Sequence, residues 1–127
     1  MSQSTVLLVE DELLLREGVQ EVLEVHGYKV VVAGDGAEAL ALLGHTPVSL
    51  IISDLVMPNM NGVDFVQRVR QQFPQLPIIV ASGSPGAVMK RLGIDSIQVP
   101  GATACIMKPF KSAELLALVK QVLLPAA

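Results

Sequence analysis

Five short apolar runs alternate along this chain with segments of helical spacing, and this alternation restricts the possible folds more than any other feature. The runs are rich in β-branched residues and leucine, as expected of strands that are buried on both faces of a sheet. They comprise residues 5–9, 29–33, 48–54, 76–82 and 103–107. Strands that alternate with helices pair in parallel through crossover connections. The pattern therefore predicts an α/β fold, with a doubly wound five-stranded parallel sheet and helices on both of its faces.

Helices are predicted between the runs from the spacing of apolar residues and from residues that begin or end helices. Gly27 is suited to the left-handed turn that follows a helix, and the hydroxyl of Ser112 is suited to an N-cap. Gly93 and Pro100 interrupt the pattern of the fourth helix. The predicted helices cover residues 12–26, 36–44, 62–73, 86–99 and 113–123. The apolar face of the first carries Leu14, Leu15, Val19, Val22, Leu23 and either Val25 or His26.

Length and composition exclude several classes of protein. We expect residues 1–127 to form a single domain, with about 4–124 structured and no output domain. Apolar runs fall short of the roughly 18 residues that a membrane helix needs, so no membrane partner is expected. The single cysteine, Cys105, cannot form an internal disulfide, which favours a reducing cytoplasm. A net charge of −3, scattered basic residues and 3% aromatic residues predict no nucleic-acid partner.

Charged and hydroxyl side chains follow four of the five predicted strands. The carboxyl ends of parallel strands meet at one edge of the sheet, so these side chains are expected to lie together. Taken singly, each has an ordinary explanation: acids can complement a helix N-terminus, and lysine is usually a surface residue. Their shared edge favours a functional site. The residues are Glu10, Asp11 and Glu12 after the first strand, Asp54 after the third, Ser82 at the fourth and Lys108 after the fifth.

The residue types at this edge indicate a particular chemistry. Clustered carboxylates raise one another's pKa unless a cation neutralises them. Oxygen ligands without histidine favour a hard ion, Mg²⁺ or Mn²⁺. A carboxylate next to such an ion can attack phosphorus, while an ammonium and a hydroxyl stabilise the charge on the phosphoryl oxygens.

Four segments together resemble the receiver domain of two-component response regulators: "LLVEDE", "DLVMPNMNG", "IIVASG" and "KPF". The resemblance spans essentially the whole chain. It implies a flavodoxin-like (βα)5 fold with strand order 2-1-3-4-5. It also implies that Asp54 accepts a phosphoryl group from a phosphohistidine of a histidine kinase or histidine phosphotransfer protein. Beyond this self-phosphorylation and a slow autodephosphorylation, no enzymatic activity is expected.

The same resemblance assigns roles to the other residues of the edge. Asp11, Asp54 and the backbone carbonyl of Val56 would bind Mg²⁺, and Glu10 would support the ion through water. Ser82 and Lys108 would contact the phosphoryl oxygens, which leads us to expect that Lys108 acts on phosphate rather than in folding. The Lys108–Pro109 bond would be cis, and Pro58 and Gly62 would form the turn into the third helix. The signal would pass to an unknown output protein through the surface of the fourth helix, fifth strand and fifth helix.

The sequence also departs from the family pattern, which leaves alternatives open. Cys105 stands where the family usually has tyrosine or phenylalanine, and the region from Ser82 to Lys108 is a few residues longer than usual. One alternative is a receiver-like scaffold whose interactions ignore phosphate. Another is an aspartyl-phosphate hydrolase, but such an enzyme would have a second aspartate at the position of Val56.

Overall fold

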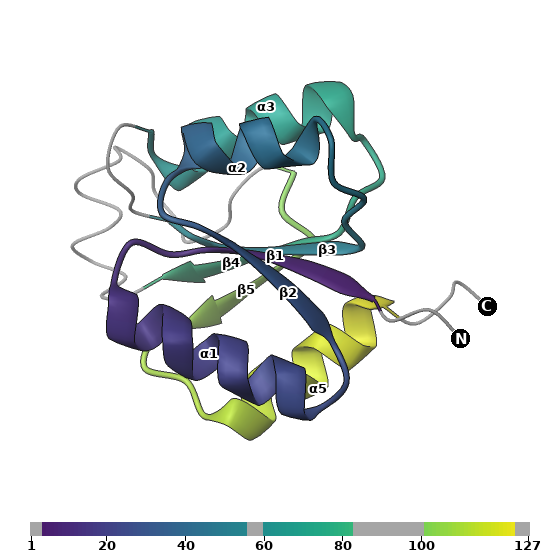
Figure 1. The fold of residues 1–127 in the computed structure, drawn as a ribbon. Helices are drawn as coiled ribbons and strands as arrows, with labels where there is room; N and C mark the ends of the chain where they lie inside the picture. Colours follow the sequence, from purple (N-terminus) through teal and green to yellow (C-terminus); the bar gives the residue numbers. More distant parts are fainter. Residues whose placement is uncertain (1–3, 56–59, 83–100, 124–127) are drawn as a thin grey trace.

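The computed structural model describes residues 4–55, 60–82 and 101–123, and strands alternate with helices from residue 5 to residue 82 (Figure 1). No helix among these residues has the length and apolar character needed to cross a membrane. The predicted helix over 86–99 lies outside the described residues. The elements are β1 (Thr5–Val9), α1 (Leu13–Val25), β2 (Lys29–Ala33), α2 (Gly36–Leu43), β3 (Leu50–Asp54), α3 (Gly62–Gln72), β4 (Ile78–Ser82), β5 (Ala104–Met107) and α5 (Ser112–Leu123).

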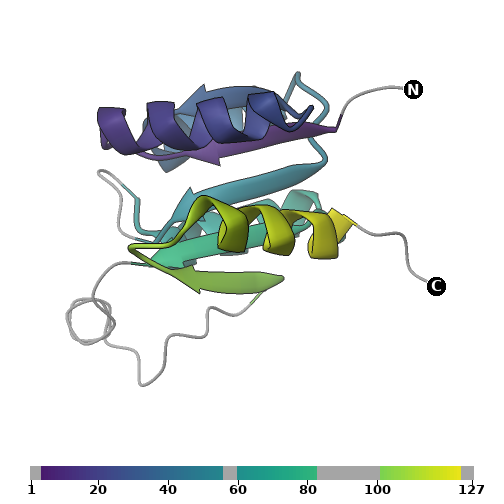
Figure 2. The ribbon, with the colours of Figure 1, turned by 90° about the horizontal axis from the view of Figure 1, so that it is seen from below.

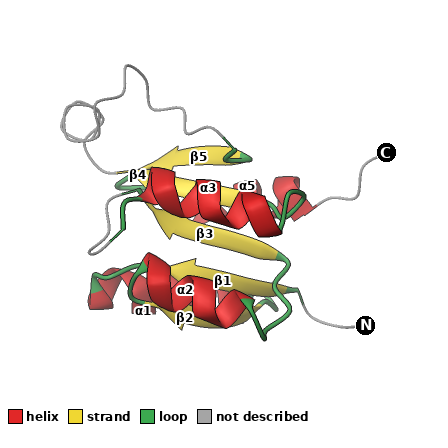
Figure 3. Ribbon diagram, turned by 90° about the horizontal axis from the view of Figure 1, so that it is seen from above, coloured by secondary structure: helices red, strands yellow, loops and turns green. Residues whose placement is uncertain are grey.

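The five strands form one parallel sheet in the order β2-β1-β3-β4-β5, which confirms the predicted flavodoxin-like topology. The arrowheads in Figure 3 point toward a single edge of the sheet. β3 and β4 each begin two residues later than the apolar runs predict. For β4 the reason is Pro77, which has no N–H to donate to a neighbouring strand.

The helices cover both faces of the sheet, with α2 and α3 on one face and α1 and α5 on the other (Figures 1 and 2). Successive residues of a strand point to opposite faces, so Leu7 packs under α2 and α3 whereas Leu8 packs under α1 and α5. Residues Val6–Val9 of β1 are all buried. A strand that lies between two helical layers therefore needs the continuous apolar run seen in the sequence.

Short polar residues and glycine set the ends of the helices. Asp35 and Asn61 accept hydrogen bonds from the N–H groups of residues three positions later, as N-caps of α2 and α3. Gly27 has a φ of +93°, which confirms its predicted place after α1. The prediction for Ser112 is wrong, because α5 begins at Ser112 itself and Leu115 donates its N–H to the carbonyl of Lys111.

Two residues of the predicted apolar face of α1 are exposed. Leu14 retains 80% of its accessible surface and Val25 retains 75%, whereas Val19 and Leu23 are buried as predicted. Leu14 borders a groove of about 320 Å³ between α1 and α5, whose other walls include Phe110 and Leu115. The helical spacing of apolar residues therefore marks two surfaces, the core and this groove.

Candidate functional site

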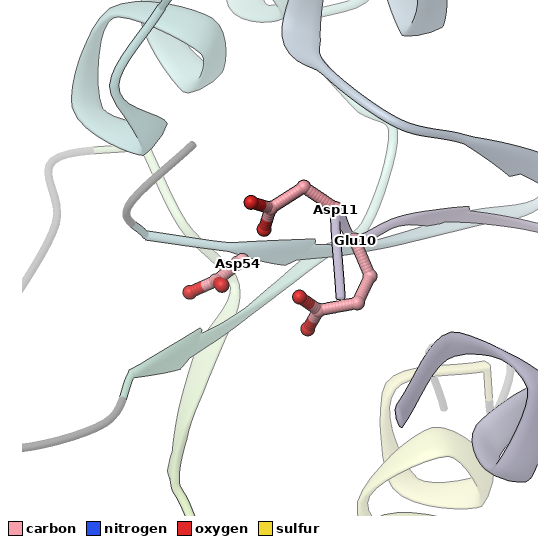
Figure 4. Close-up of side chains that lie close together, drawn as sticks. All are labelled: Glu10, Asp11 and Asp54. Atoms are coloured by element: carbon pink, nitrogen blue, oxygen red, sulfur yellow. The ribbon is translucent and has the colours of Figure 1, made fainter. Parts of the chain in front are cut away.

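Three carboxylates meet at the edge where β1 and β3 end. Glu10 and Asp11 directly follow β1, and Asp54 is the last residue of β3. β1 and β3 are neighbours in register, with Val9 opposite Ser53. Carboxylate oxygens of the three residues lie within 4.8 Å of one another (Figure 4). The predicted convergence of acids is thus present, with Glu10 buried, Asp54 half-buried and Asp11 exposed.

Lys108 lies between two of these carboxylates. Its Nζ donates to Oε1 of Glu10 at 2.8 Å and to Oδ2 of Asp54 at 3.1 Å. Lys108 follows β5, which is separated from β1 by β3 and β4, so only the sheet brings these residues together. The peptide bond from Lys108 to Pro109 is cis, as predicted. The lysine at the end of an apolar strand is therefore explained by the acids that it neutralises.

Burial and neighbouring groups shift the pKa values of both Glu10 and Lys108. Burial raises the pKa of Glu10, and the charge of Asp54 raises it further. Hydrogen bonds from Lys108 and from the N–H of Glu12 partly oppose this shift. Burial lowers the pKa of Lys108, but the hydrogen bond to Glu10 and the charges of Asp54 and Glu10 outweigh it, so the pKa is raised. Both groups are ionised most readily in each other's presence.

The donor set fits a hard divalent cation. Three carboxylates face one ammonium, so the fully ionised cluster keeps an excess of negative charge that a cation can neutralise. Carboxylate oxygens without histidine or thiolate suit Mg²⁺. Asp11 and Asp54 would hold the ion directly. Glu10 already shares its carboxylate between Lys108 and the N–H of Glu12, which suits a supporting position.

One other predicted site residue, Ser82, is placed only in part by the structure. Ser82 ends β4 opposite Met107, one position beyond Ala81, the residue that pairs with Asp54, so its backbone is at the same edge. The side chain of Ser82 is not among the described atoms. Val56 and Pro58 lie outside the described residues.

Gly62 shows why the turn into α3 needs glycine. The N–H of Gly62 donates to the carbonyl of Leu55 at 2.6 Å. A Cβ atom on Gly62 would lie 2.6 Å from the Cα of Leu55, which is too close for any side chain. Gly62 therefore lies directly against the residue that follows Asp54.

Sequence reasoning missed one residue next to the site. Arg16 of α1 donates through Nη1 to the backbone carbonyl of Glu10 at 3.4 Å. A Cβ on Gly34 would lie 3.7 Å from the same nitrogen, so Arg16 spans the gap between α1 and the loop after β2. The available signal was an arginine one helical turn after the acids, which by itself does not identify a contact to a carbonyl.

The ion pairs of Lys108 change what is expected of its removal. Lys108→Met should lower the free energy of unfolding by about 1–2 kcal/mol at neutral pH without Mg²⁺, because Glu10 and Asp54 lose the cation between them. This figure is below the cost for a fully buried pair, since water reaches Lys108. Thermal and urea unfolding measure it, and added Mg²⁺ should reduce the loss. Lys111→Met, which removes an exposed lysine with the same charge change, should have little effect.

The same variant has a defined pH dependence. A raised pKa of Glu10 means that the folded state takes up a proton more readily, so the free energy of unfolding falls as pH rises from 4.5 through the folded pKa. Lys108→Met removes a hydrogen bond that holds this pKa down, so its deficit should grow from mildly acid to neutral pH. The raised pKa of Lys108 stabilises the wild type below pH 10.5, and this stabilisation is lost above its folded pKa. A deficit that is constant from acid to alkaline pH would contradict the ion-pair role.

Known proteins are similar in sequence to this chain across nearly its whole length. The family model described as "Response regulator receiver domain" matches residues 6–120. "Transcriptional regulatory protein CpxR" of Klebsiella pneumoniae subsp. pneumoniae is 36% identical over 118 residues, which cover 93% of this chain and 48% of that protein. "DNA-binding response regulator MtrA" of Mycobacterium tuberculosis is 37% identical over 115 residues, with 91% and 48% covered. The chain thus spans about half the length of these curated relatives.

Solved structures agree with the sequence comparison. The chemotaxis response regulator CheY4 of Vibrio cholerae has a TM-score of 0.78 and 34% identity, covering 95% of this chain and 99% of that one. A CheY-like receiver domain protein of Methanospirillum hungatei JF-1 has a TM-score of 0.82 and 25% identity, with 96% and 94% covered. The strand order, the carboxylates at the ends of β1 and β3 and the lysine after β5 occur here together. The chain therefore belongs to the response regulator receiver domain family of two-component signalling.

Proposed function

We propose that this chain is the phosphoacceptor of a two-component phosphorelay and that Asp54 receives the phosphoryl group. One observation carries the proposal: Lys108 contacts Asp54 and Glu10 at the point where three carboxylates approach within 4.8 Å. Such a cluster is costly for a protein that uses it only for stability, because like charges repel one another. It is suited to a site where a second cation and a phosphoryl group arrive.

The proposed reaction transfers a phosphoryl group from a phosphohistidine to Asp54. A carboxylate oxygen of Asp54 attacks phosphorus, and the bond between phosphorus and the donor imidazole nitrogen breaks. The electron pair of that bond stays on the imidazole, which then takes a proton from solvent, and Asp54 becomes an acyl phosphate. Lys108 balances negative charge on the transferred oxygens, and Ser82 is proposed to donate to one of them.

Mg²⁺ fits this site as a resident ion. Asp11 and Asp54 would hold it through carboxylate oxygens, Val56 through its backbone carbonyl and Glu10 through water. When bound, the ion supplies charge neutralisation for the carboxylates and the incoming phosphoryl oxygens. The ammonium of Lys108, which pairs with Glu10 and Asp54 in this structure, would lie within reach of a phosphoryl group on Asp54.

The partners and location belong to the same proposal. The phosphoryl donor is a histidine kinase or a histidine phosphotransfer protein, and the location is cytoplasmic. The response would pass to an output protein through a surface that includes β5 and α5, and the predicted fourth helix of that surface lies outside the described residues. The relatives CpxR and MtrA are named as transcriptional and DNA-binding regulators, and this chain covers about half of the length of each. DNA binding is therefore not proposed for residues 1–127.

Intact mass spectrometry tests the proposal directly. The protein is incubated with one of two phosphodonors, either acetyl phosphate or a phosphorylated histidine kinase. Each incubation is done once with Mg²⁺ and once with excess chelator. A gain equal to one phosphoryl group is expected in the presence of Mg²⁺ and should disappear in chelator. If well-folded protein gains no mass from either donor, the alternative of a phosphate-independent scaffold is favoured.

Cys105 is the observation that supports the scaffold alternative. It lies on the edge strand β5 as an exposed residue, at the position where the family usually has an aromatic ring. A cysteine side chain cannot fill and vacate a pocket of ring size. We therefore expect that the signal in this chain passes through Ser82 and the loop after it, with Cys105 passive.

Cys105→Ala is accordingly expected to change the rate and extent of phosphorylation by less than about twofold, since it removes only a small thiol from an exposed position. Partner binding that depends on phosphate should also stay nearly unchanged. Ser82→Ala serves as the comparison and should weaken the dependence of binding on phosphate. If Cys105→Ala abolishes that dependence while Ser82→Ala keeps it, the thiol is the switch.

A further inference from the structure

The placement of Lys108 depends on the register of a short edge strand. β5 has four residues and, among the described strands, pairs with β4 alone, with Ala104 opposite Ile79 and Met107 opposite Ser82. The strands are parallel and joined through a crossover, so no hairpin turn fixes their register. A slip by one residue would turn Lys108 to the opposite face, away from Asp54. The core contacts of Ala104 and Ile106 favour the observed register, and contacts just before the strand can fix it further.

Arg70 of α3 binds the chain just before β5. Its Nε donates to the carbonyl of Gly101 at 2.8 Å, and Nη2 lies 3.5 Å from the hydroxyl oxygen of Thr103. Nη1 donates to the carbonyls of Phe73 at 3.1 Å and Leu76 at 2.5 Å. One guanidinium thus joins the end of α3, the loop before β4 and the entry to β5. The flat fork of arginine donors suits oxygens that are spread in this way.

The hydroxyl of Thr103 accepts a hydrogen bond that a backbone carbonyl would accept in a regular β4–β5 pair. The N–H of Thr103 donates to the carbonyl of Ile78 at 2.8 Å, as in a regular parallel pair. In a regular pair the N–H of Ile78 would then donate to the carbonyl of Gly101, two positions before Thr103. That carbonyl is bound to Arg70, and the N–H of Ile78 donates to the hydroxyl of Thr103 at 3.0 Å.

The backbone at Gly101 makes this exchange possible. Its φ of +90° is a conformation that residues with a Cβ rarely adopt. A Cβ at this position would also lie 3.1 Å from Cγ of Arg70 and from Cγ1 of Val66. The ladder therefore ends at one defined residue, and Thr103 is the only position of this segment whose hydroxyl meets both Arg70 and Ile78 among the described contacts.

We propose that Arg70 and Thr103 are positioning residues, which fix the register of β5 and thereby place the Lys108 ammonium between Glu10 and Asp54. Thr103 and Lys108 are five positions apart, so the clamp acts over roughly 16 Å of extended strand. Neither residue touches the carboxylates, and their effect reaches the site through the direction in which Lys108 leaves the strand. Only the kinetic part of this inference rests on the proposed phosphotransfer. The pairing of Lys108 can be tested without it.

Thr103→Val and Thr103→Ser form a matched pair for the test. Valine keeps the shape of threonine but leaves the N–H of Ile78 without its acceptor, whereas serine keeps the hydroxyl. Thr103→Val should slow phosphorylation by acetyl phosphate about 10- to 100-fold, as expected when a supporting residue lets a reacting group move. It should also tighten Mg²⁺ binding about two- to fivefold, because Lys108 no longer competes for Asp54 and Glu10. Thr103→Ser should restore both values.

These two changes have opposite signs, which general loosening of the fold would not produce. A second readout needs neither metal nor phosphate: the stability loss from Thr103→Val should be smaller in a Lys108→Met background than in wild type. Sites this far apart normally have additive effects, so a smaller loss shows that both variants remove the same ion pair. Additive losses, or weaker Mg²⁺ binding in Thr103→Val, would overturn the proposal.

If Thr103→Val does not fold, Arg70→Lys provides the same test. Lysine keeps the charge but cannot reach the spread carbonyls, so the opposite changes in Mg²⁺ affinity and phosphorylation should appear in weaker form. If Arg70→Lys binds Mg²⁺ with the same affinity as wild type, the proposal is overturned. If wild type takes up no phosphoryl group, the proposed function fails, while Mg²⁺ affinity and the additivity measurement still decide whether the clamp positions Lys108.

Discussion

Asp54→Asn is expected to abolish phosphoryl uptake from acetyl phosphate and from phosphorylated kinase, with a loss of at least about three orders of magnitude in rate. The amide has the shape of the carboxylate but lacks the anionic oxygen that would attack phosphorus. In the wild type, Nζ of Lys108 donates to Oδ2 of Asp54 at 3.1 Å. The amide oxygen of asparagine can still accept this hydrogen bond, so the fold should be kept. Intact mass and the rate of mass gain measure the effect.

The control for this variant is Asp35→Asn, which removes the same charge at another aspartate. Asp35 is the N-cap of α2 and accepts from the N–H of Glu38, a role that asparagine fills equally well. Normal phosphorylation is expected. If Asp54→Asn still gains a phosphoryl group and peptide mapping places it on Asp11 or Glu10, the assignment of the acceptor is wrong.

The elements that sequence reasoning predicted well are those fixed by burial on both sides. β1 is flanked by two strands and two helical layers, so its residues must be apolar without interruption, and its bounds were predicted correctly. Glycine at position 27 was equally informative, because few other residues adopt its positive φ. The convergence of Glu10, Asp11 and Asp54 followed from the rule that parallel strands end at one edge.

The placement of Lys108 beside the acids was predicted, but its individual ion pairs with Glu10 and Asp54 depend on how β1, β3, β4 and β5 are paired in the sheet. The features that were missed depend on packing or on partners that are distant in sequence. In the sequence, Arg70 is indistinguishable from any other polar residue near the end of a helix. Its role is recognised only from the structure, which shows the carbonyls that it binds. Leu14 has the spacing of a core residue, but its position on α1 faces the groove beside α5. Pattern shows which face of an element is apolar, and packing decides what covers it.

Asp11→Asn is expected to weaken Mg²⁺ binding at least about tenfold and to slow phosphorylation correspondingly at low Mg²⁺. Asp11 is the exposed member of the three carboxylates, so the fold does not depend on burying it. The amide keeps a neutral oxygen ligand but removes the charge that favours a hard cation. Mg²⁺ affinity can be followed by calorimetry or by the increase in Tm with added ion. Raising the Mg²⁺ concentration should restore much of the rate, because the variant loses affinity rather than the nucleophile.

Glu12→Gln is the matched control for Asp11→Asn, since it removes one charge from the next residue in the chain. The described contact from Glu12 to Glu10 is made by its backbone N–H, which glutamine retains. Any effect of net charge alone would appear equally in both variants, and salt would screen it. A specific ligand role predicts a large effect for Asp11→Asn and almost none for Glu12→Gln. Equal effects, or full phosphorylation of Asp11→Asn at low Mg²⁺, would show that the ion is held by other oxygens.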